Sequence, residues 1–140
     1  MEFSQISKTL SKKIKKEDKK KQGIYFTPKS IIQKNLDILK DYFVNIKHIL
    51  EPSCGTGEYI SVINELYPDI SVTGIEYNKQ IYDSIKDDFP NILNQDFINF
   101  EIEQKYDLII GNPPFYVIKK KDYIFAVSYT HLRAHETDSY

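Results

Sequence analysis

The sequence predicts an α/β fold, a Rossmann-like doubly wound sheet with mostly parallel strands, on three observations. Short apolar runs of strand length alternate with stretches in which apolar residues recur at helical spacing. A glycine turn at residues 55–57 follows the first apolar run and precedes a helical pattern, which is typical of a nucleotide-binding βαβ unit. A fourth run, Tyr106–Ile110, leads into Gly111 and two prolines, which remove backbone donors and end the strand. We expect the sheet to be truncated after this fourth strand.

Local signals give the order of the helices and strands. Thr27 is a good N-cap and Pro28 suits a first helical position, so a helix should begin there. Its apolar stripe would consist of Ile32, Leu36, Leu39 and Phe43. Two further helices are expected over Glu58–Leu66 and Asn78–Phe89, with strands over Ile46–Leu50, Ser71–Glu76, Asn91–Phe97 and Tyr106–Ile110. His48 lies within the first strand and is expected to be structural.

Length and composition bound the class of protein. A chain of 140 residues can bury one core. Its net charge is −1, but residues 1–21 contain eight lysines and only three acids. We expect residues 1–22 to be a basic, disordered arm, although such an arm is also compatible with a polyanion partner. Cys54 is the only cysteine and no apolar run reaches membrane-span length. A soluble, cytoplasmic protein is expected.

Residue usage changes near the carboxyl end. Both alanines, the only arginine and two of the three histidines lie after Phe125. The segment 127–137 also resembles a translated sequencing-library adapter. We therefore expect a partial catalytic domain over residues 23–126 and an artefactual tail over 127–140, with an ordinary polar terminus as the alternative.

The ends of the predicted strands carry the polar groups. A glycine turn admits a ligand close to the backbone and presents N–H groups at a helix start. Glu76 follows Gly57 by nineteen residues, about the spacing at which a carboxylate binds ribose hydroxyls. Tyr77 offers a flat face for an adenine. The third strand likewise ends in an acid followed by an aromatic residue, Asp96 and Phe97. Right-handed crossovers place these ends at one edge of a parallel sheet, so the sequence predicts a site there.

Together with Tyr25–Pro28, these motifs resemble the N6-adenine DNA methyltransferases, in the subgroup whose cofactor motifs precede the catalytic motif. The likeness spans roughly Gly23 to Phe115. It implies a class I methyltransferase fold, S-adenosylmethionine as cofactor, DNA as partner and a place in restriction-modification. The cofactor residues that it implies are Thr27, Glu51, Ser53, Gly55, Gly57, Glu76, Tyr77, Asp96 and Phe97.

The catalytic residues that the resemblance implies are Asn112, Pro113, Pro114 and Phe115. An adenine in a duplex must be flipped out before its N6 can react. The Asn112 side-chain oxygen and the Pro113 carbonyl can each accept an N6 hydrogen, and Phe115 can stack on the base. Methyl transfer is then a direct displacement without a covalent enzyme intermediate, and no metal site is expected.

Three alternatives remain open from the sequence. Methyltransferases that act on a protein glutamine or an rRNA base share an Asn-Pro-Pro-aromatic loop. A non-catalytic module that binds S-adenosylmethionine or DNA is a second alternative. As a third, the chain as given is expected to be an incomplete and inactive fragment, because four strands leave a bare edge at Leu108–Ile110.

Overall fold

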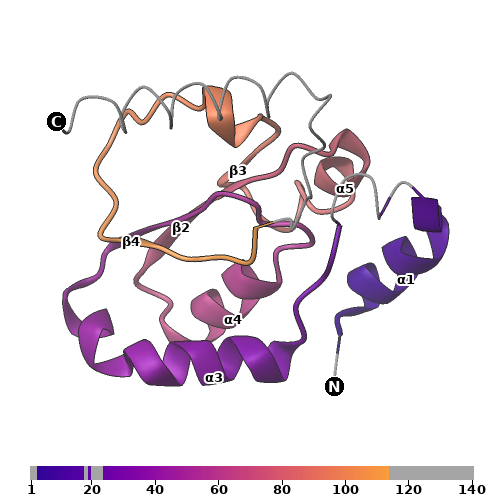
Figure 1. Ribbon diagram of the computed structural model, residues 1–140. Helices are drawn as coiled ribbons and strands as arrows, with labels where there is room; N and C mark the ends of the chain where they lie inside the picture. Colours follow the sequence, from indigo (N-terminus) through magenta and orange to yellow (C-terminus); the bar gives the residue numbers. More distant parts are fainter. Residues whose placement is uncertain (1–2, 18, 20–23, 114–140) are drawn as a thin grey trace, which may run out of the picture.

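The computed structural model describes residues 3–17, 19 and 24–113 (Figure 1). The predicted catalytic residues Pro114 and Phe115 and the expected tail over 127–140 lie outside the described residues.

Four parallel strands form the sheet, in the order β3-β2-β1-β4. They are β1 (His48–Glu51), β2 (Ser71–Ile75), β3 (Ile92–Leu93) and β4 (Leu108–Ile109). In the centre, Ile49 of β1 lies opposite Val72 of β2 on one side and Leu108 of β4 on the other. Because every neighbouring pair is parallel, the carboxyl ends of the strands meet at one edge, and the predicted α/β fold is confirmed.

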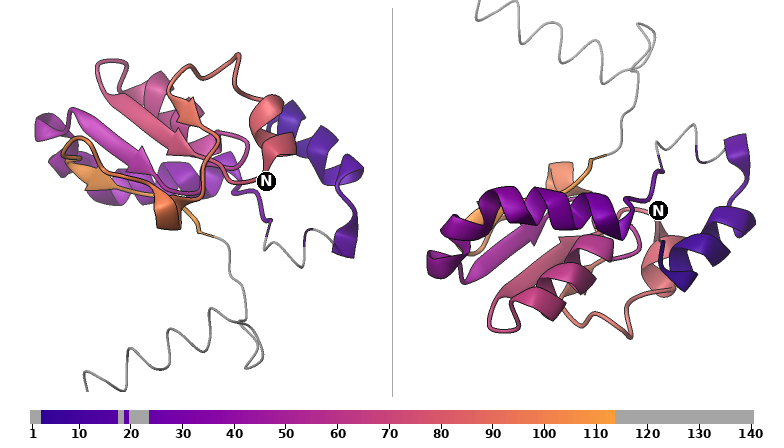
Figure 2. Two further views of the ribbon diagram at one scale, coloured as in Figure 1. Left: turned by 90° about the horizontal axis from the view of Figure 1, so that it is seen from above. Right: turned by 90° about the horizontal axis from the view of Figure 1, so that it is seen from below.

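Helices α3 (Lys29–Leu39) and α4 (Glu58–Leu66) pack side by side on one face of this sheet (Figures 1 and 2). The 3-10 helix η1 (Lys40–Asn45) follows α3 directly. The short helix α5 (Lys79–Asp83) follows β2, and the 3-10 turn η2 (Phe97–Asn99) follows β3. Within the described ranges, no helix is long and apolar enough to span a bilayer.

The core lies between these two helices and the sheet. Ile32 and Leu36 come from α3, Ile63 from α4, and Ile49 and Val72 from the central strands; all are at most 4% exposed. Full burial of one such side chain stabilises a fold by about 1.5–3 kcal/mol. This packing holds the strand ends, and the residues that follow them, in fixed positions.

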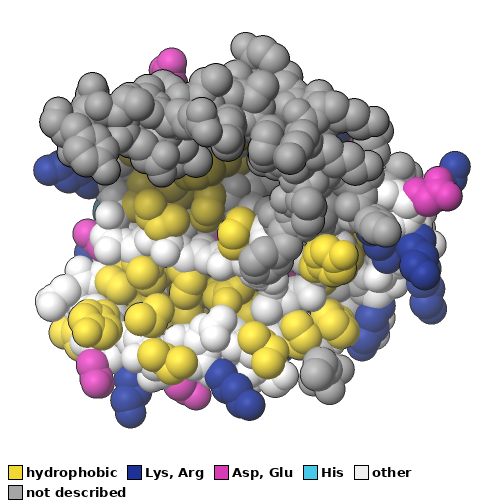
Figure 3. Space-filling model, in the orientation of Figure 1, with side chains coloured by type: hydrophobic (Ala, Val, Ile, Leu, Met, Phe, Trp, Pro, Cys, Tyr) yellow, Lys and Arg dark blue, Asp and Glu magenta, His cyan; other side chains and the backbone are white. Residues whose placement is uncertain are grey.

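The opposite face of the sheet is less covered by the described residues. Leu93 is 42% exposed and Ile109 is 58% exposed. Figure 3, in the orientation of Figure 1, shows that apolar side chains also reach the surface on the side of the molecule where β4 lies. The described residues therefore do not bury Ile109, although it belongs to an apolar strand. Among the described strands, β4 pairs with β1 alone and forms one edge of the sheet.

The amino-terminal region differs from the disordered arm that was expected over residues 1–22. Gln5–Lys13 form helix α1, capped by the Ser4 hydroxyl, which accepts a hydrogen bond from the Ser7 N–H at 3.1 Å. Leu10 and Ile14 are buried and cluster with Ile81 of α5. This apolar stripe gives the lysine-rich segment a partner surface.

Two expected helix boundaries also shift. Pro28, rather than Thr27, is the N-cap of α3, and there is no side-chain cap because proline has no acceptor; the Thr27 hydroxyl accepts a hydrogen bond from Asn112. The Asn78 side chain caps α5, which ends at Asp83, six residues before the predicted end at Phe89. The segment after it turns so that Phe89 packs near Gly57.

Candidate functional site

A cavity of about 570 Å³ lies at the carboxyl ends of the strands. Eight of the residues that the sequence predicted line it: Ser53, Gly55, Glu76, Tyr77, Asp96, Phe97, Asn112 and Pro113. They come from the loops after β1, β2, β3 and β4, so all four strands contribute to one site, as expected from the parallel sheet.

A small recess of about 20 Å³ adjoins this cavity and shares Ser53, Gly55 and Asn112 with it. Thr27 and Glu51 line the recess, so the structure brings these two predicted residues to the same place. Gly57 lines neither space. It is the N-cap of α4 at φ 74°, and a Cβ there would lie 2.6 Å from the Phe89 ring, so packing accounts for this glycine.

Glu76 joins the ends of β1 and β2. Its Oε2 accepts a hydrogen bond from the Gly55 N–H at 2.9 Å, and its Oε1 accepts one from the Asn78 N–H at 2.6 Å. Burial raises the pKa of this carboxyl to about 7, although both backbone donors favour the ionised form. Each carboxylate oxygen retains a further lone pair, so Glu76 can accept additional hydrogen bonds from a ligand.

Glu51 and Ser53 place unpaired polar atoms beside Glu76. Glu51 is 2% exposed, and in the described structure neither its Oε2 nor the Ser53 Oγ has a hydrogen-bond partner. Burial, and then the negative charge of Glu76, raises the pKa of Glu51 well above its ordinary value. A buried carboxylate without a partner is unfavourable, and a donor group with positive charge would relieve it.

Asn112 is held by a residue far away in the sequence. Its Nδ2 donates a hydrogen bond to the Thr27 hydroxyl at 3.2 Å. Within the described structure, no hydrogen bond engages the other end of this amide, Oδ1. The side chain therefore has its donor end fixed and its acceptor end available. Gly111, just before it, allows the close approach to β1, since a Cβ there would lie 3.3 Å from the Glu51 Cγ.

Two aromatic rings stand at the open side of the cavity. Tyr77 is 72% exposed and Phe97 is 40% exposed. The Asn94 side chain donates to the backbone oxygens of Glu76 and Tyr77, at 2.7 and 3.2 Å, which fixes the turn that carries Tyr77. Asp96 caps the 3-10 turn η2 by accepting from the Ile98 N–H, and this positions Phe97.

The sequence reasoning missed several lining residues. Ile24, Tyr25 and Phe26 form one wall, and Gln95 and Ile98 flank the predicted Asp96 and Phe97. The aromatic pair was visible as part of the Tyr25–Pro28 motif. The other contacts depend on how extended backbone outside the strands folds over the site, which leaves no local signal.

No family model matches the chain. Several curated proteins are similar to it, three of which are type II methyltransferases or a modification methylase. Modification methylase CviBIII of Paramecium bursaria Chlorella virus NC1A is 38% identical over 128 residues, which cover 87% of this chain and 33% of the relative. Type II methyltransferase M.CvrRI of Paramecium bursaria Chlorella virus XZ-6E is 35% identical, over 81% of this chain and 30% of the relative. Type II methyltransferase M.AccI of Acinetobacter calcoaceticus is 34% identical, over 79% of this chain and 21% of the relative. The chain thus spans about a third of their length or less.

Solved structures agree on the fold. CalS10, an amino pentose methyltransferase from Micromonospora echinaspora, matches with a TM-score of 0.54 over 80% of this chain and 43% of that protein. The sugar N-methyltransferase KedS8 from Streptoalloteichus sp ATCC 53650 matches with a TM-score of 0.51 over 80% of this chain and 41% of that protein. At 14% and 13% identity these matches show a shared architecture, which is the class I methyltransferase fold.

The sequence relatives and the fold lead to the same assignment, and the resemblance found in the motifs is confirmed. Over most of its length the chain is similar to type II methyltransferases, and it spans about a third of such a protein.

Proposed function

We propose that the cavity binds S-adenosylmethionine and that the protein methylates the N6 amine of adenine in DNA. One observation carries the proposal: Glu76, Asn112 and the unpaired carboxylate of Glu51 meet at the carboxyl ends of adjacent parallel strands. In open α/β sheets this edge is where ligands bind. The type II methyltransferases among the relatives support the reaction class.

The residues present fit the cofactor. Glu51 Oε2 and Ser53 Oγ are buried without partners, and they would bind the amino-acid end of the ligand. Gly55, at φ 54°, has only the Phe26 ring near the place of a Cβ, at 3.8 Å, so the backbone is open to close approach. When bound, the cofactor supplies a methyl group on a positively charged sulfur. A cationic group of the ligand beside Glu51 would in turn favour the ionised form of this buried carboxyl.

The adenosine half would lie along the opposite wall. Glu76 would accept hydrogen bonds from the ribose hydroxyls while keeping its bonds to Gly55 and Asn78. Tyr77 and Phe97 are exposed enough to pack on an adenine ring, a contact worth about 1–3 kcal/mol for a stacked base. Asp96 lines the same cavity and would accept from the exocyclic amine of that adenine.

Asn112 would receive the target amine. Since its Nδ2 is bonded to Thr27, Oδ1 is the end that can accept an N6 hydrogen. The Pro113 carbonyl would accept the second one. Two acceptors on one amine favour a tetrahedral nitrogen whose lone pair is free to attack, which is a matter of orientation and electrostatics. The target base would have to leave the duplex to reach this position.

A cytoplasmic setting is part of the same proposal. Cys54, the only cysteine of the chain, is free and buried, which fits a reducing compartment.

The reaction can be tested with the gene product that carries this chain. It would be incubated with S-adenosylmethionine labelled in the methyl group and with unmethylated DNA, and the digested DNA would be analysed by mass spectrometry. We expect N6-methyladenine, and none from Asn112→Ala, with S-adenosylhomocysteine affinity unchanged in that variant. Label on a cytosine, in RNA or in a protein, or full activity of Asn112→Ala, would contradict the proposal.

A further inference from the structure

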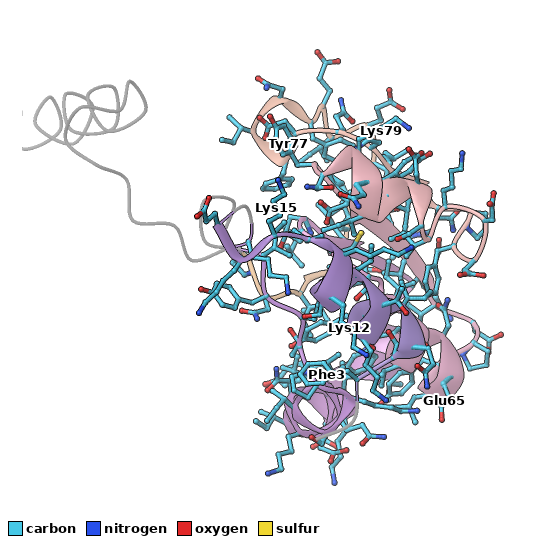
Figure 4. All side chains as sticks on the ribbon, turned by 90° about the vertical axis from the view of Figure 1, so that its right-hand side faces the viewer. Phe3, Lys12, Lys15, Glu65, Tyr77 and Lys79 are labelled. Atoms are coloured by element: carbon cyan, nitrogen blue, oxygen red, sulfur yellow. The ribbon has the colours of Figure 1, made fainter. Side chains whose placement is uncertain are left out.

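A second cavity, of about 720 Å³, lies between α1 and the segment that leads into the candidate site. Four lysines line it, namely Lys8, Lys12, Lys16 and Lys19. Lys8 and Lys12 lie on one face of α1 because four residues make about one helical turn. Figure 4 looks at this side of the molecule, with Lys12 and Lys15 labelled.

Helix α1 is anchored, so these lysines are held in place. Ser7 is 1% exposed, and its hydroxyl lies 2.6 Å from the Thr56 hydroxyl and donates to Glu58 Oε1 at 2.5 Å. Those two partners belong to the glycine turn and the first residue of α4. Leu10 and Ile14 add the apolar contact to α5. The basic helix is thereby fixed to the turn that the candidate site uses.

The positive charge on this surface is not neutralised within the described structure. Lysines 8, 12, 13, 15 and 16 form no ion pair with a described acid, and Glu17 is the only acid among the described residues from 3 to 19. Lys19 donates to the Ser11 backbone and hydroxyl oxygens, which are neutral groups. Clustered lysines that form no ion pair within the described structure favour the binding of a polyanion.

The lysine-lined cavity and the candidate site share a wall. Ile24, Tyr25 and Phe26 line both, so the two cavities adjoin at one short extended segment. Tyr25 is 64% exposed at this divide. A basic groove beside an exposed aromatic ring is the combination by which proteins track a nucleic-acid backbone and stack a base.

We propose that the lysine face of α1, together with Lys16 and Lys19, binds the phosphodiester backbone of DNA, next to the nucleotide that enters the candidate site. This inference rests on the proposed function, since it assigns the surface to the same substrate. Phosphate contacts fix the register of a protein on DNA without reading its sequence. The surface therefore positions the strand, and base recognition is left to other parts of the protein.

The test compares DNA affinity in two triple variants. Lys8→Gln/Lys12→Gln/Lys16→Gln removes three charges from the cavity. Lys34→Gln/Lys40→Gln/Lys47→Gln is the matched control, since it removes three exposed charges from α3, η1 and the segment before β1. Binding of a fluorescent duplex of mixed sequence would be followed by anisotropy at several salt concentrations. Each lost phosphate contact should reduce the slope of log affinity against log salt by about 0.9.

We expect the slope to fall by up to about 2.7 in the cavity variant, with a matching loss of affinity at low salt, and little change in the control. Equal effects in both variants, no effect in either, or no DNA binding by the unaltered protein would overturn the inference. Poly-glutamate that binds as tightly, with the same dependence on these lysines, would assign the surface to an acidic protein and overturn it too.

S-adenosylhomocysteine binding, measured on the same samples, separates this inference from the proposed function. Both variants should bind it as the unaltered protein does. If they do and DNA binding is insensitive to the cavity lysines, only the inference fails. If the unaltered protein does not bind this ligand, the proposed function itself fails.

Discussion

Glu76 should couple cofactor binding to the loss of a proton. The carboxyl group is 8% exposed, and burial raises its pKa from the ordinary 4.5 to about 7. It is therefore about half protonated at neutral pH before a ligand arrives. Ribose hydroxyls that donate to both oxygens require the ionised form, since a protonated oxygen is itself a donor.

The size of the effect follows from that pKa. With a value of about 7, the ionised fraction is about one in eleven at pH 6 and about ten in eleven at pH 8. Affinity for the ligand should therefore rise roughly tenfold between these two pH values, which corresponds to about 1.4 kcal/mol. The stability of the ligand-free protein changes with pH in the opposite direction from ligand affinity. It falls as pH rises from 4.5 toward 7, because the folded state binds this proton more tightly than the unfolded state does.

Calorimetric titration with S-adenosylhomocysteine over this pH range measures the slope. Repeating the titration in buffers of different ionisation enthalpy counts the protons released. Glu76→Gln is the matched variant, since it keeps the shape of the side chain and cannot titrate. A second ligand, 5′-methylthioadenosine, lacks the amino-acid end and so excludes a contribution from Glu51.

We expect the affinity of the unaltered protein for both ligands to rise with pH, and we expect this pH dependence to be absent in Glu76→Gln. A flat pH profile for the unaltered protein would refute the reasoning. A slope of the same size in Glu76→Gln would show that another group titrates, and a slope seen with S-adenosylhomocysteine alone would point to Glu51.

Three further substitutions test other parts of the site. Glu51→Gln should stabilise the ligand-free protein by about 1–3 kcal/mol in urea unfolding, because it removes a buried carboxyl group without a partner. The gain should grow as pH rises, and unchanged stability would contradict the burial of Glu51. Thr27→Val should slow methyl transfer roughly tenfold, the value of about one hydrogen bond to Asn112, and Thr27→Ser should restore it; a loss of cofactor affinity instead would assign Thr27 to the ligand. Gly57→Ala should destabilise the fold by about 1–2 kcal/mol or more, from its φ of 74° and the nearby Phe89 ring, and an unaltered urea midpoint would argue against this backbone conformation.

The part of the fold that rests on periodic patterns could be predicted from the sequence. Helix α4 has the predicted bounds, Glu58–Leu66, because a glycine turn, an acidic first turn and an apolar stripe all agree there. The parallel order of the strands also followed from the alternation of helices and strands. Elements with weaker local signals were placed less well. The helix after β2 ends at Asp83, since the next residues include Ser84, Asp87 and Asp88, which favour turns over helix.

Helix α1 was not predicted, because its lysine-rich composition is typical of a disordered segment. A count of lysines predicted a disordered arm, but Leu10 and Ile14 lie at helical spacing and continue the line of Ser7. That stripe was readable in the sequence. What could not be read was its partner, Ile81 of α5, which only the folded chain brings to it.

The role of Thr27 shows the limit of local reasoning about the site. As a residue before Pro28 it has the chemistry of an N-cap, and the resemblance assigned it to the cofactor. In the structure its hydroxyl is bonded to Asn112, 85 residues away in the chain. Such a contact depends on how the segment before α3 crosses the end of β4. The strand ends themselves were predictable because parallel strands must present them together.

A crystal structure of this chain with S-adenosylhomocysteine tests the central claim most directly. We expect the ligand in the cavity at the strand ends, with both ribose hydroxyls within hydrogen-bond distance of the Glu76 carboxylate. Its amino-acid end should contact Glu51 or Ser53, and its sulfur should face Asn112. A ligand bound elsewhere, or bound in this cavity with its ribose away from Glu76, would contradict the account.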